Sequence, residues 1–183
     1  MLAYVFWHWP RPGIDLAAYE ANLRIFHQTL TANKPPGFQN STVFSTNGSD
    51  WLDTKGPVFE DWYLMDDSAA LDRVNEAAVT GACEQPHHAV AKDAAGGTAG
   101  LYRLRQGTAE LSNKSVAVWF SKPDGVSYRE FFARIDEENF KGAALWQRQM
   151  TLGPTREFCL LSEDEDQSSR ISGLKVLLKV IWS

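Results

Sequence analysis

The sequence contains two segments that match each other at a constant separation of 112 positions, and this internal similarity constrains the fold more than any other feature. The matched residues fall where a strand, a turn and a helix are expected: Trp7 with Trp119, Gly13 with Gly125, Ile14 with Val126, Asp15 with Ser127, Tyr19 with Phe131 and Leu23 with Ile135. Self-similarity at a fixed spacing is typical of a chain built from repeated units. Chance is the alternative explanation, because strand–turn–helix segments resemble one another.

The first half of the chain predicts the order strand, helix, strand, strand, helix, strand. Residues 3–9 are β-branched and aromatic and end at Pro10, which is typical of a strand. Asp15 can cap a helix whose apolar residues recur at helical spacing as far as Leu30. Further strands are expected at 38–46, 58–65 and 101–105, a helix after 66–68, and a short helix from Pro86 to Gly96-Gly97. This order is that of the ferredoxin-like unit.

The second half predicts a shortened copy of the same unit. Ser127 is expected to cap its helix, and strands are expected at 115–120, 144–152, 156–161 and 174–182. An acidic segment, 163–169, stands where the second helix of the unit would be, and we expect it to form a solvated loop. In the last strand we expect one side to carry Leu174, Val176, Leu178, Val180 and Trp182. The sequence therefore predicts an α+β fold with two ferredoxin-like units, 1–113 and 114–183.

The sheet of a ferredoxin-like unit carries helices on one face and leaves the other face bare. That bare face needs cover from another sheet, a partner subunit or a ligand. Two units in one chain can pack sheet against sheet and form an α+β barrel with the helices outside. A homodimer of the chain is another way to cover such a face.

This arrangement resembles the dimeric α+β barrel superfamily, here fused in tandem within one chain. Within the superfamily the sequence is most similar to the EthD-like group, in which an aromatic residue, a bulky residue and a His follow at four-residue spacing before a Pro-Gly pair. Tyr19, Leu23 and His27 have this spacing, and Pro36-Gly37 follows. The match covers about residues 4–65, with Leu23 where the group usually has Trp. In the second copy, the position of His27 is taken by Asn139 and that of the Pro-Gly pair by Lys141-Gly142.

Composition and motifs argue against several classes of function. Lys and Arg number 18 against 23 Asp and Glu, a net charge of −5, and no basic stripe predicts nucleic-acid binding. The two cysteines lack zinc-ligand spacing, and no P-loop, GxGxxG, GxSxG or HExxH is present, so neither a metal nor a cofactor is expected. The apolar run 2–9 is too short to span a bilayer and lacks secretion-signal features. We therefore expect no membrane partner and a cytoplasmic protein.

Two histidines are the leading candidates for acid–base chemistry. His27 lies beside the apolar stripe of the first helix and could exchange a proton with a ligand at the barrel mouth; otherwise it is a half-buried surface residue. His8 shares one side of the first strand with Tyr4, so the two either face the barrel interior or belong to the core between sheet and helices. The adjacent pair His87 and His88 is expected at a solvated helix start.

Charged and aromatic residues within strands are the candidates for ligand binding. Asp61 and Arg103 fall inside predicted strands, where a charge either faces a polar cavity, pairs with another charge or lies at an exposed edge. Trp62, Trp119 and Trp146 could line a pocket for a flat apolar ligand, with ordinary core packing as the alternative.

Two functions follow from these observations. The resemblance implies an enzyme that oxygenates, isomerises or breaks down a modest apolar small molecule, in some members without any cofactor. His27 or His8 would then act as acid or base, and Tyr4 or Arg103 would orient the substrate. The alternative is a non-catalytic ligand-binding or assembly protein of the same fold, because this architecture supports many unrelated functions.

Overall fold

The computed structural model describes residues 1–46, 48–54, 56–138, 140, 142–151 and 153–183. The first unit contains β1 (Leu2–Pro10), α1 (Leu16–Ala32), β2 (Phe38–Thr46), β3 (Val58–Met65), α2 (Ala69–Val79), the 3₁₀ turn η1 (Gly81–Cys83), α3 (Glu84–Ala91) and β4 (Ala94–Gln106). The second contains β5 (Val116–Phe120), α4 (Tyr128–Glu138), β6 (Ala144–Thr151), β7 (Phe158–Ser162), α5 (Glu165–Ser168), β8 (Leu174–Leu177) and β9 (Lys179–Trp182).

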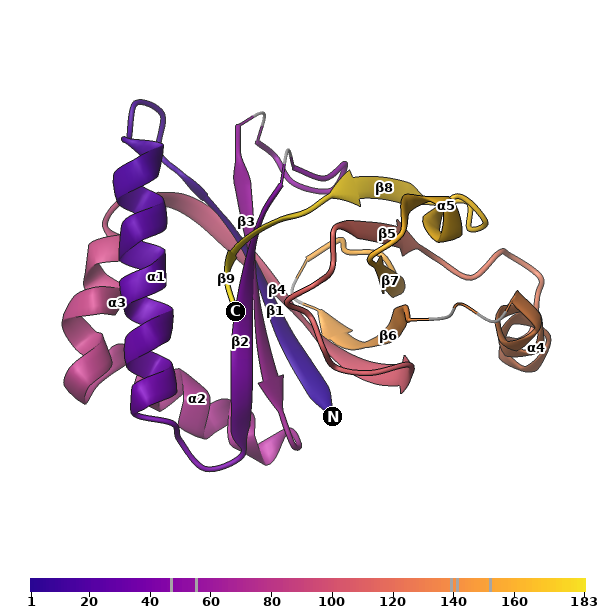
Figure 1. Ribbon diagram of the computed structural model, residues 1–183, viewed down its shortest axis with the longest axis horizontal. Coiled ribbons are helices and arrows are strands. Elements are labelled where there is room, and N and C mark those ends of the chain that lie inside the picture. Colours follow the sequence, from indigo (N-terminus) through magenta and orange to yellow (C-terminus); the bar gives the residue numbers. More distant parts are fainter. Residues whose placement is uncertain (47, 55, 139, 141, 152) are drawn as a thin grey trace.

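Both units have the strand order of the ferredoxin-like fold. The first runs β4-β1-β3-β2 and the second β8-β5-β7-β6, with antiparallel pairing throughout. Strand β6 joins the two units by pairing with β4, and β9 pairs with β2 at the other end. Because β8 and β9 are separated only by Leu178, the sheet curls into a nearly closed barrel with the helices outside (Figure 1). The expected α+β barrel is confirmed, and each bare sheet face is covered by the other unit.

Aromatic side chains fill the barrel interior. Trp7, Trp62, Trp119 and Trp146 are fully buried, and their rings pack edge-on, with centroids 5.3 Å apart for Trp7–Trp119 and 5.6 Å for Trp62–Trp146. Trp51, from the segment between β2 and β3, packs against Trp7 at 6.0 Å. Such edge-to-face contacts add to the stability gained from burying the rings. The interior is therefore the main hydrophobic core.

The first helix begins and packs as its sequence predicts. The side chain of Asp15 accepts hydrogen bonds from the backbone N–H groups of Ala17 at 2.9 Å and Ala18 at 3.4 Å, so it caps α1. The side of α1 that faces the sheet is buried at Tyr19, Leu23, Phe26, His27 and Leu30. The position of His27 in this stripe places an imidazole between the helix and the sheet.

Gly96 and Gly97 lie within β4, which corrects the expectation that they end a helix. Helix α3 ends at Ala91, and β4 begins at Ala94. A Cβ on Gly96 would lie 2.6 Å from the ring of Trp9, and one on Gly97 would lie 2.5 Å from the ring of Phe6. The two glycines are needed because rings from β1 lie directly on the backbone of β4.

Two expectations for the second unit are also corrected. The acidic segment contains one helical turn, α5, because the side chain of Asp164 accepts a hydrogen bond from the backbone of Asp166 at 2.8 Å. The last strand is interrupted at Leu178, where the chain leaves β5 and begins to pair with β2. This change of partner shifts the alternation, so Val180 is 36% exposed while Ile181 is buried.

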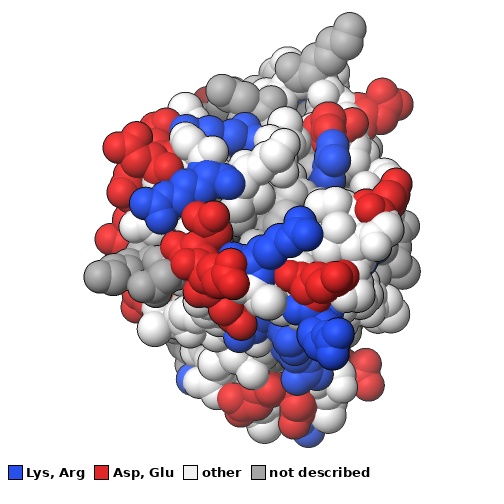
Figure 2. Space-filling view, turned by 90° about the vertical axis from the view of Figure 1, so that its right-hand side faces the viewer, with Lys and Arg blue, Asp and Glu red and all other residues white. Residues whose placement is uncertain are grey.

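The outer surface on the side of α4, at the right in Figure 1, carries charges of both signs. Lys and Arg side chains are mixed there with Asp and Glu, without a separate basic stripe (Figure 2). No helix within the described residues is both long and apolar enough to cross a membrane.

Candidate functional site

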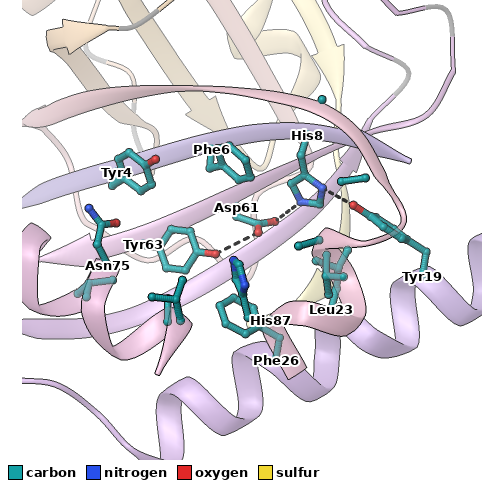
Figure 3. A pocket seen from close by; sticks show the side chains of 17 residues that line it. Tyr4, Phe6, His8, Tyr19, Leu23, Phe26, Asp61, Tyr63, Asn75 and His87 are labelled. Atoms are coloured by element: carbon teal, nitrogen blue, oxygen red, sulfur yellow. Dashed lines mark hydrogen bonds and ion pairs between the residues drawn. The ribbon is translucent and has the colours of Figure 1, made fainter. Parts of the chain in front are cut away.

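A pocket of about 510 Å³ lies outside the barrel, between the sheet of the first unit and its helices (Figure 3). Its walls come from β1, β3, the start of β4, and α1, α2 and α3. Most of the wall is apolar, including Phe6, Leu23, Phe26, Val74 and Val90. Polar groups reach it from Tyr4, His8, Tyr19, Asp61, Tyr63 and His87. A concave, mostly apolar pocket with a few convergent polar groups is the usual form of a small-molecule site.

Strand alternation decides which side chains face this pocket. Tyr4, Phe6 and His8 occupy alternate positions of β1 and point toward the helices, while Val5 and Trp7 belong to the barrel core. Asp61 and Tyr63 point toward the helices in the same way from β3. His8 and Tyr4 therefore lie in the layer between sheet and helices rather than in the barrel interior.

Asp61 is the centre of a buried hydrogen-bond network. His8 Nε2 lies 3.2 Å from Asp61 Oδ1, and His27 Nε2 lies 3.2 Å from Asp61 Oδ2. The hydroxyl of Tyr63 donates to Asp61 Oδ2 at 3.1 Å. The other ring nitrogens also have partners: His8 Nδ1 lies 2.7 Å from Tyr19 Oη, and His27 Nδ1 lies 2.8 Å from Ser41 Oγ. Every polar atom of both imidazoles is thus engaged.

The protons of this network can be placed consistently. With Asp61 ionised and both imidazoles neutral, each Nε2–H donates to the carboxylate, and the hydroxyls of Tyr19 and Ser41 donate to the Nδ1 atoms. Burial alone would raise the pKa of Asp61, but the positive charge that either imidazole carries when protonated, and the hydrogen bonds that both rings donate, outweigh it, and the pKa falls below its ordinary range. Burial, and next the charge of Asp61, raise the pKa of Tyr19 and of Tyr63, so both hydroxyls stay protonated.

Aromatic rings fix the orientation of both histidines. The imidazole of His8 is stacked between Phe6 and Phe59, with centroids 5.4 Å and 5.6 Å away and interplanar angles of 18° and 20°. The imidazole of His27 stacks on Tyr63 at 5.2 Å and meets Phe26 edge-on at 5.0 Å. A network held this rigidly is preorganised, which is what proton transfer requires.

The structure brings some of the sequence-predicted site residues together. His8, Asp61 and Tyr4 line the pocket, and the ring of Tyr4 lies 6.0 Å from that of Tyr63. Burial, and then the charge of Asp61, raise the pKa of Tyr4. His27 joins the same network, but it is fully buried behind Asp61 and does not line the pocket. It can act on a ligand only through Asp61.

Other predicted ligand-binding residues lie elsewhere. Arg103 is exposed on β4, where its Nε donates to Gln149 Oε1 at 3.2 Å, and it is not part of the pocket wall. Trp62, Trp119 and Trp146 belong to the barrel core instead. The reason is again alternation, because Trp62 follows Asp61 directly and so points to the opposite side of the sheet.

Three contributors were not selected from the sequence. Tyr19 has the spacing of a core residue, so its hydroxyl was not distinguished from an ordinary packing contact. Ser41 has no recognisable signal within β2. His87 was expected at a solvated helix start, but it is half-buried, lines the pocket, and meets the ring of Phe26 edge-on at 5.7 Å.

Three of these places in the second unit, those of His8, Tyr19 and Asp61, are apolar. The 112-position separation aligns β1 with β5, so Val118 is the counterpart of Phe6. Phe6 pairs with Asp61 on β3, and Val118 pairs with Leu160 on β7, so Leu160 is the counterpart of Asp61. The counterparts of His8, Tyr19 and Asp61 are then Phe120, Phe131 and Leu160, which pack together in one apolar cluster. Asn139, the expected counterpart of His27, lies outside the described residues. A ferredoxin-like unit can therefore be packed without this polar network.

Within the part of the chain that the structure describes, no group of three His, Cys, Asp or Glu side chains is placed to hold a metal ion. The histidine nitrogens nearest to Asp61 are already engaged with its oxygens.

Comparison with known proteins supports the fold and no more specific property of the chain. No family model and no curated protein sequence matches the chain. Among solved structures, a candidate monooxygenase from Lactobacillus acidophilus NCFM has a TM-score of 0.58 at 10% identity, covering 99% of this chain and 94% of its own. A candidate chlorite dismutase gives 0.55 at 14% identity, with 98% and 93% covered, and an anthrone oxidase-like protein gives 0.50 at 8%, with 98% and 90% covered. These are dimeric α+β barrel proteins, and this chain has their fold.

Proposed function

We propose that this protein binds a compact apolar small molecule in the pocket of its first unit and exchanges a proton with it through Tyr19, His8 and Asp61. One observation carries the proposal: a rigid, buried carboxylate–imidazole–hydroxyl chain opens onto an apolar pocket of about 510 Å³. The apolar counterparts in the second unit support it, because packing alone does not need these polar groups. Replacing a buried, hydrogen-bonded charge and its partners by well-packed apolar side chains is often neutral or stabilising, so a purely structural role would be met more simply by apolar residues.

Tyr19 is the end of the chain that meets the ligand. When His8 is neutral, the Tyr19 hydroxyl donates to His8 Nδ1. If a ligand hydroxyl donates to the oxygen of Tyr19, the tyrosine proton can move to His8 while the ligand proton moves to Tyr19. The ligand becomes an anion, and the imidazolium of His8 is stabilised by Asp61 at 3.2 Å. The reverse movement delivers a proton to a ligand oxygen or carbon.

The reaction class we propose is the oxygenation, isomerisation or breakdown of an apolar compound, with no cofactor needed for the proton steps. The EthD-like spacing of Tyr19, Leu23 and His27 supports this assignment. In this arrangement Tyr19 contacts the ligand, Leu23 is part of the apolar wall, and His27 positions Asp61. Tyr4 lies on the same wall and is suited to orient the ligand.

We also propose that the chain is a tandem repeat, with units 1–113 and 114–183, in which only the first unit keeps the polar site. The identical strand orders and the constant separation of 112 positions support the repeat. Among the described residues, the first unit alone then carries this network beside a pocket. The barrel closes within a single chain, so a second copy is not needed to cover the inner sheet faces.

A non-catalytic ligand-binding protein is the second candidate. The observation that favours it is that both nitrogens of His8 and both nitrogens of His27 already have protein partners. Such a network could serve only to fix the shape of the pocket. The two candidates differ in one respect, because only the first predicts that a bound hydroxyl compound loses its proton.

The test uses 2-naphthol, which reports its own ionisation by absorbance and fluorescence. We expect the wild-type protein to bind it and to increase the fraction of naphtholate at neutral pH. Tyr19→Phe should keep binding but lose the naphtholate signal, and Tyr128→Phe on exposed α4 is the matched control. Ala78→Trp should fill the pocket and abolish binding. Binding without any naphtholate signal would favour the non-catalytic candidate, and unchanged binding by Ala78→Trp would overturn the pocket assignment.

A further inference from the structure

On its helical side the pocket has a histidine whose ring nitrogens have no hydrogen-bond partner among the described residues. His87 comes from α3 and lines the pocket opposite the sheet that carries His8 and Asp61 (Figure 3). Its ring meets Phe26 edge-on at 5.7 Å, which fixes its position. Among the described residues, no hydrogen bond involves either nitrogen of His87, whereas all four nitrogens of His8 and His27 are occupied. A half-buried imidazole with free nitrogens is available to a ligand.

We propose that His87 accepts the hydrogen bond of a ligand hydroxyl in this pocket, so that the ligand class is an apolar compound carrying a weakly acidic hydroxyl group. The inference rests on the proposed function, because it requires that the pocket binds a small molecule. A neutral imidazole nitrogen is a strong acceptor for such a hydroxyl. His87 on α3 and Tyr19 on α1 line the same pocket. Because the ligand hydroxyl has a single proton, its hydrogen bond to His87 holds the neutral ligand, and this bond is exchanged for one to Tyr19 when the proton is transferred.

The surroundings of His87 keep its imidazole neutral. Burial, and next the positive charge available at His88, lower the pKa of His87. The titratable groups that line the pocket together with His87 are Tyr4, His8, Tyr19, Asp61 and Tyr63. Cys83, Glu84 and His88 are the titratable residues within four positions of His87 along the chain. The pocket-lining residues of α2 are Val74, Asn75, Ala78 and Val79, none of which titrates. Near neutral pH the acceptor is therefore available, and it is lost when His87 takes up a proton.

The test compares 2-naphthol with 2-methoxynaphthalene, which has nearly the same shape but no hydroxyl proton. Binding is measured by fluorescence titration, and the imidazole nitrogens are followed by ¹⁵N NMR. For wild-type protein we expect 2-naphthol to bind about tenfold more tightly, which corresponds to one buried hydrogen bond. The nitrogen signals of His87 should move with 2-naphthol and stay in place with 2-methoxynaphthalene. Because the bound hydroxyl favours the neutral ring, the titration of His87 should move to lower pH.

Two variants separate a ligand contact from a structural role. His87→Phe keeps a ring against Phe26 but removes this acceptor, so it should lose most of the preference for 2-naphthol. His88→Asn, at the adjacent and exposed position, is the matched control and should keep the preference. If His87→Phe retains the full preference, or the His87 signals do not respond to bound 2-naphthol, the inference is wrong while the proposed function stands. If neither compound binds the wild-type protein, the proposed function fails and the inference fails with it.

Discussion

Replacing Glu60 by Gln should stabilise the protein above neutral pH and have little effect near pH 5. Glu60 lies on β3, is 1% exposed, and points into the aromatic core of the barrel. Its Oε2 accepts a hydrogen bond from the indole of Trp62 at 3.3 Å. Burial raises the pKa of Glu60 to about 7, against the opposing effect of this bond. The folded protein therefore keeps Glu60 protonated under conditions in which the unfolded chain ionises it.

The magnitude and sign follow from the two pKa values. The ordinary value, 4.5, applies to the unfolded chain, and the folded value is about 7. Because the folded value is higher, the contribution to stability is fully present below pH 4.5 and is lost as the pH rises through 7. At about 1.4 kcal/mol per pKa unit, this loss reaches about 3 kcal/mol by pH 8. Gln cannot ionise, so the Glu60→Gln variant should not show this loss of stability as the pH rises.

The assay is urea unfolding of both proteins at pH 5, 6, 7 and 8. All other groups titrate alike in both proteins, so the difference between the two free energies of unfolding isolates the contribution of Glu60 to the pH dependence of stability. We expect this difference to grow by about 2–3 kcal/mol between pH 5 and pH 8 in favour of the variant. Glu76→Gln, at an exposed position of α2, is the matched control and should show no such change. Parallel curves for wild type and Glu60→Gln would refute the reasoning.

Three further predictions concern the stability of the first unit, each measured by urea unfolding at constant slope. Asp15→Ala should cost about 0.5–2 kcal/mol because it removes the cap of α1, and an unchanged midpoint would exclude Asp15 as the cap. Asp61→Leu should cost about 3–5 kcal/mol because it leaves His8 and His27 without their carboxylate. Adding His8→Phe and Tyr19→Phe to Asp61→Leu should recover part of the lost stability, since the second unit has Phe120, Phe131 and Leu160 at these three positions. A further loss of stability would contradict this comparison of the two units. Gly97→Ala should cost about 1–3 kcal/mol, because its Cβ would lie 2.5 Å from the ring of Phe6; a neutral effect would mean that Phe6 can move freely.

The order of elements in the first unit could be predicted because its signals are local. The apolar stripe that ends at Leu30 and the capping side chain of Asp15 are decided within a few residues of the chain. Gly96-Gly97 was wrongly expected to end a helix, because the reason for these glycines is a ring that arrives from β1. The interruption at Leu178 was missed for a similar reason, since it depends on which strands the chain pairs with.

The candidate site could be predicted only in part. A charge or a His within a strand needs a partner, which is why Asp61 and His8 were selected. Alternation shows that Asp61 and Trp62 point to opposite sides of the sheet, but it does not show which side the helices cover. The contributions of Tyr19 and His87 depend on how α1 and α3 pack against the sheet, so spacing alone could not reveal them.

Glu60 and Asp61 show how two equally buried carboxyl groups on adjacent residues acquire opposite properties. Each is exposed by 3% or less, yet burial raises the pKa of Glu60, while the two imidazoles lower that of Asp61. Near neutral pH, Glu60 can hold its proton among the indoles of the barrel, whereas Asp61 carries a negative charge beside the pocket. A fixed negative charge next to His8 favours the imidazolium that forms when a ligand gives up a proton. The sheet thus separates the aromatic core of the barrel from a polar network beside the pocket, and the proton chemistry that we propose lies on the helical side.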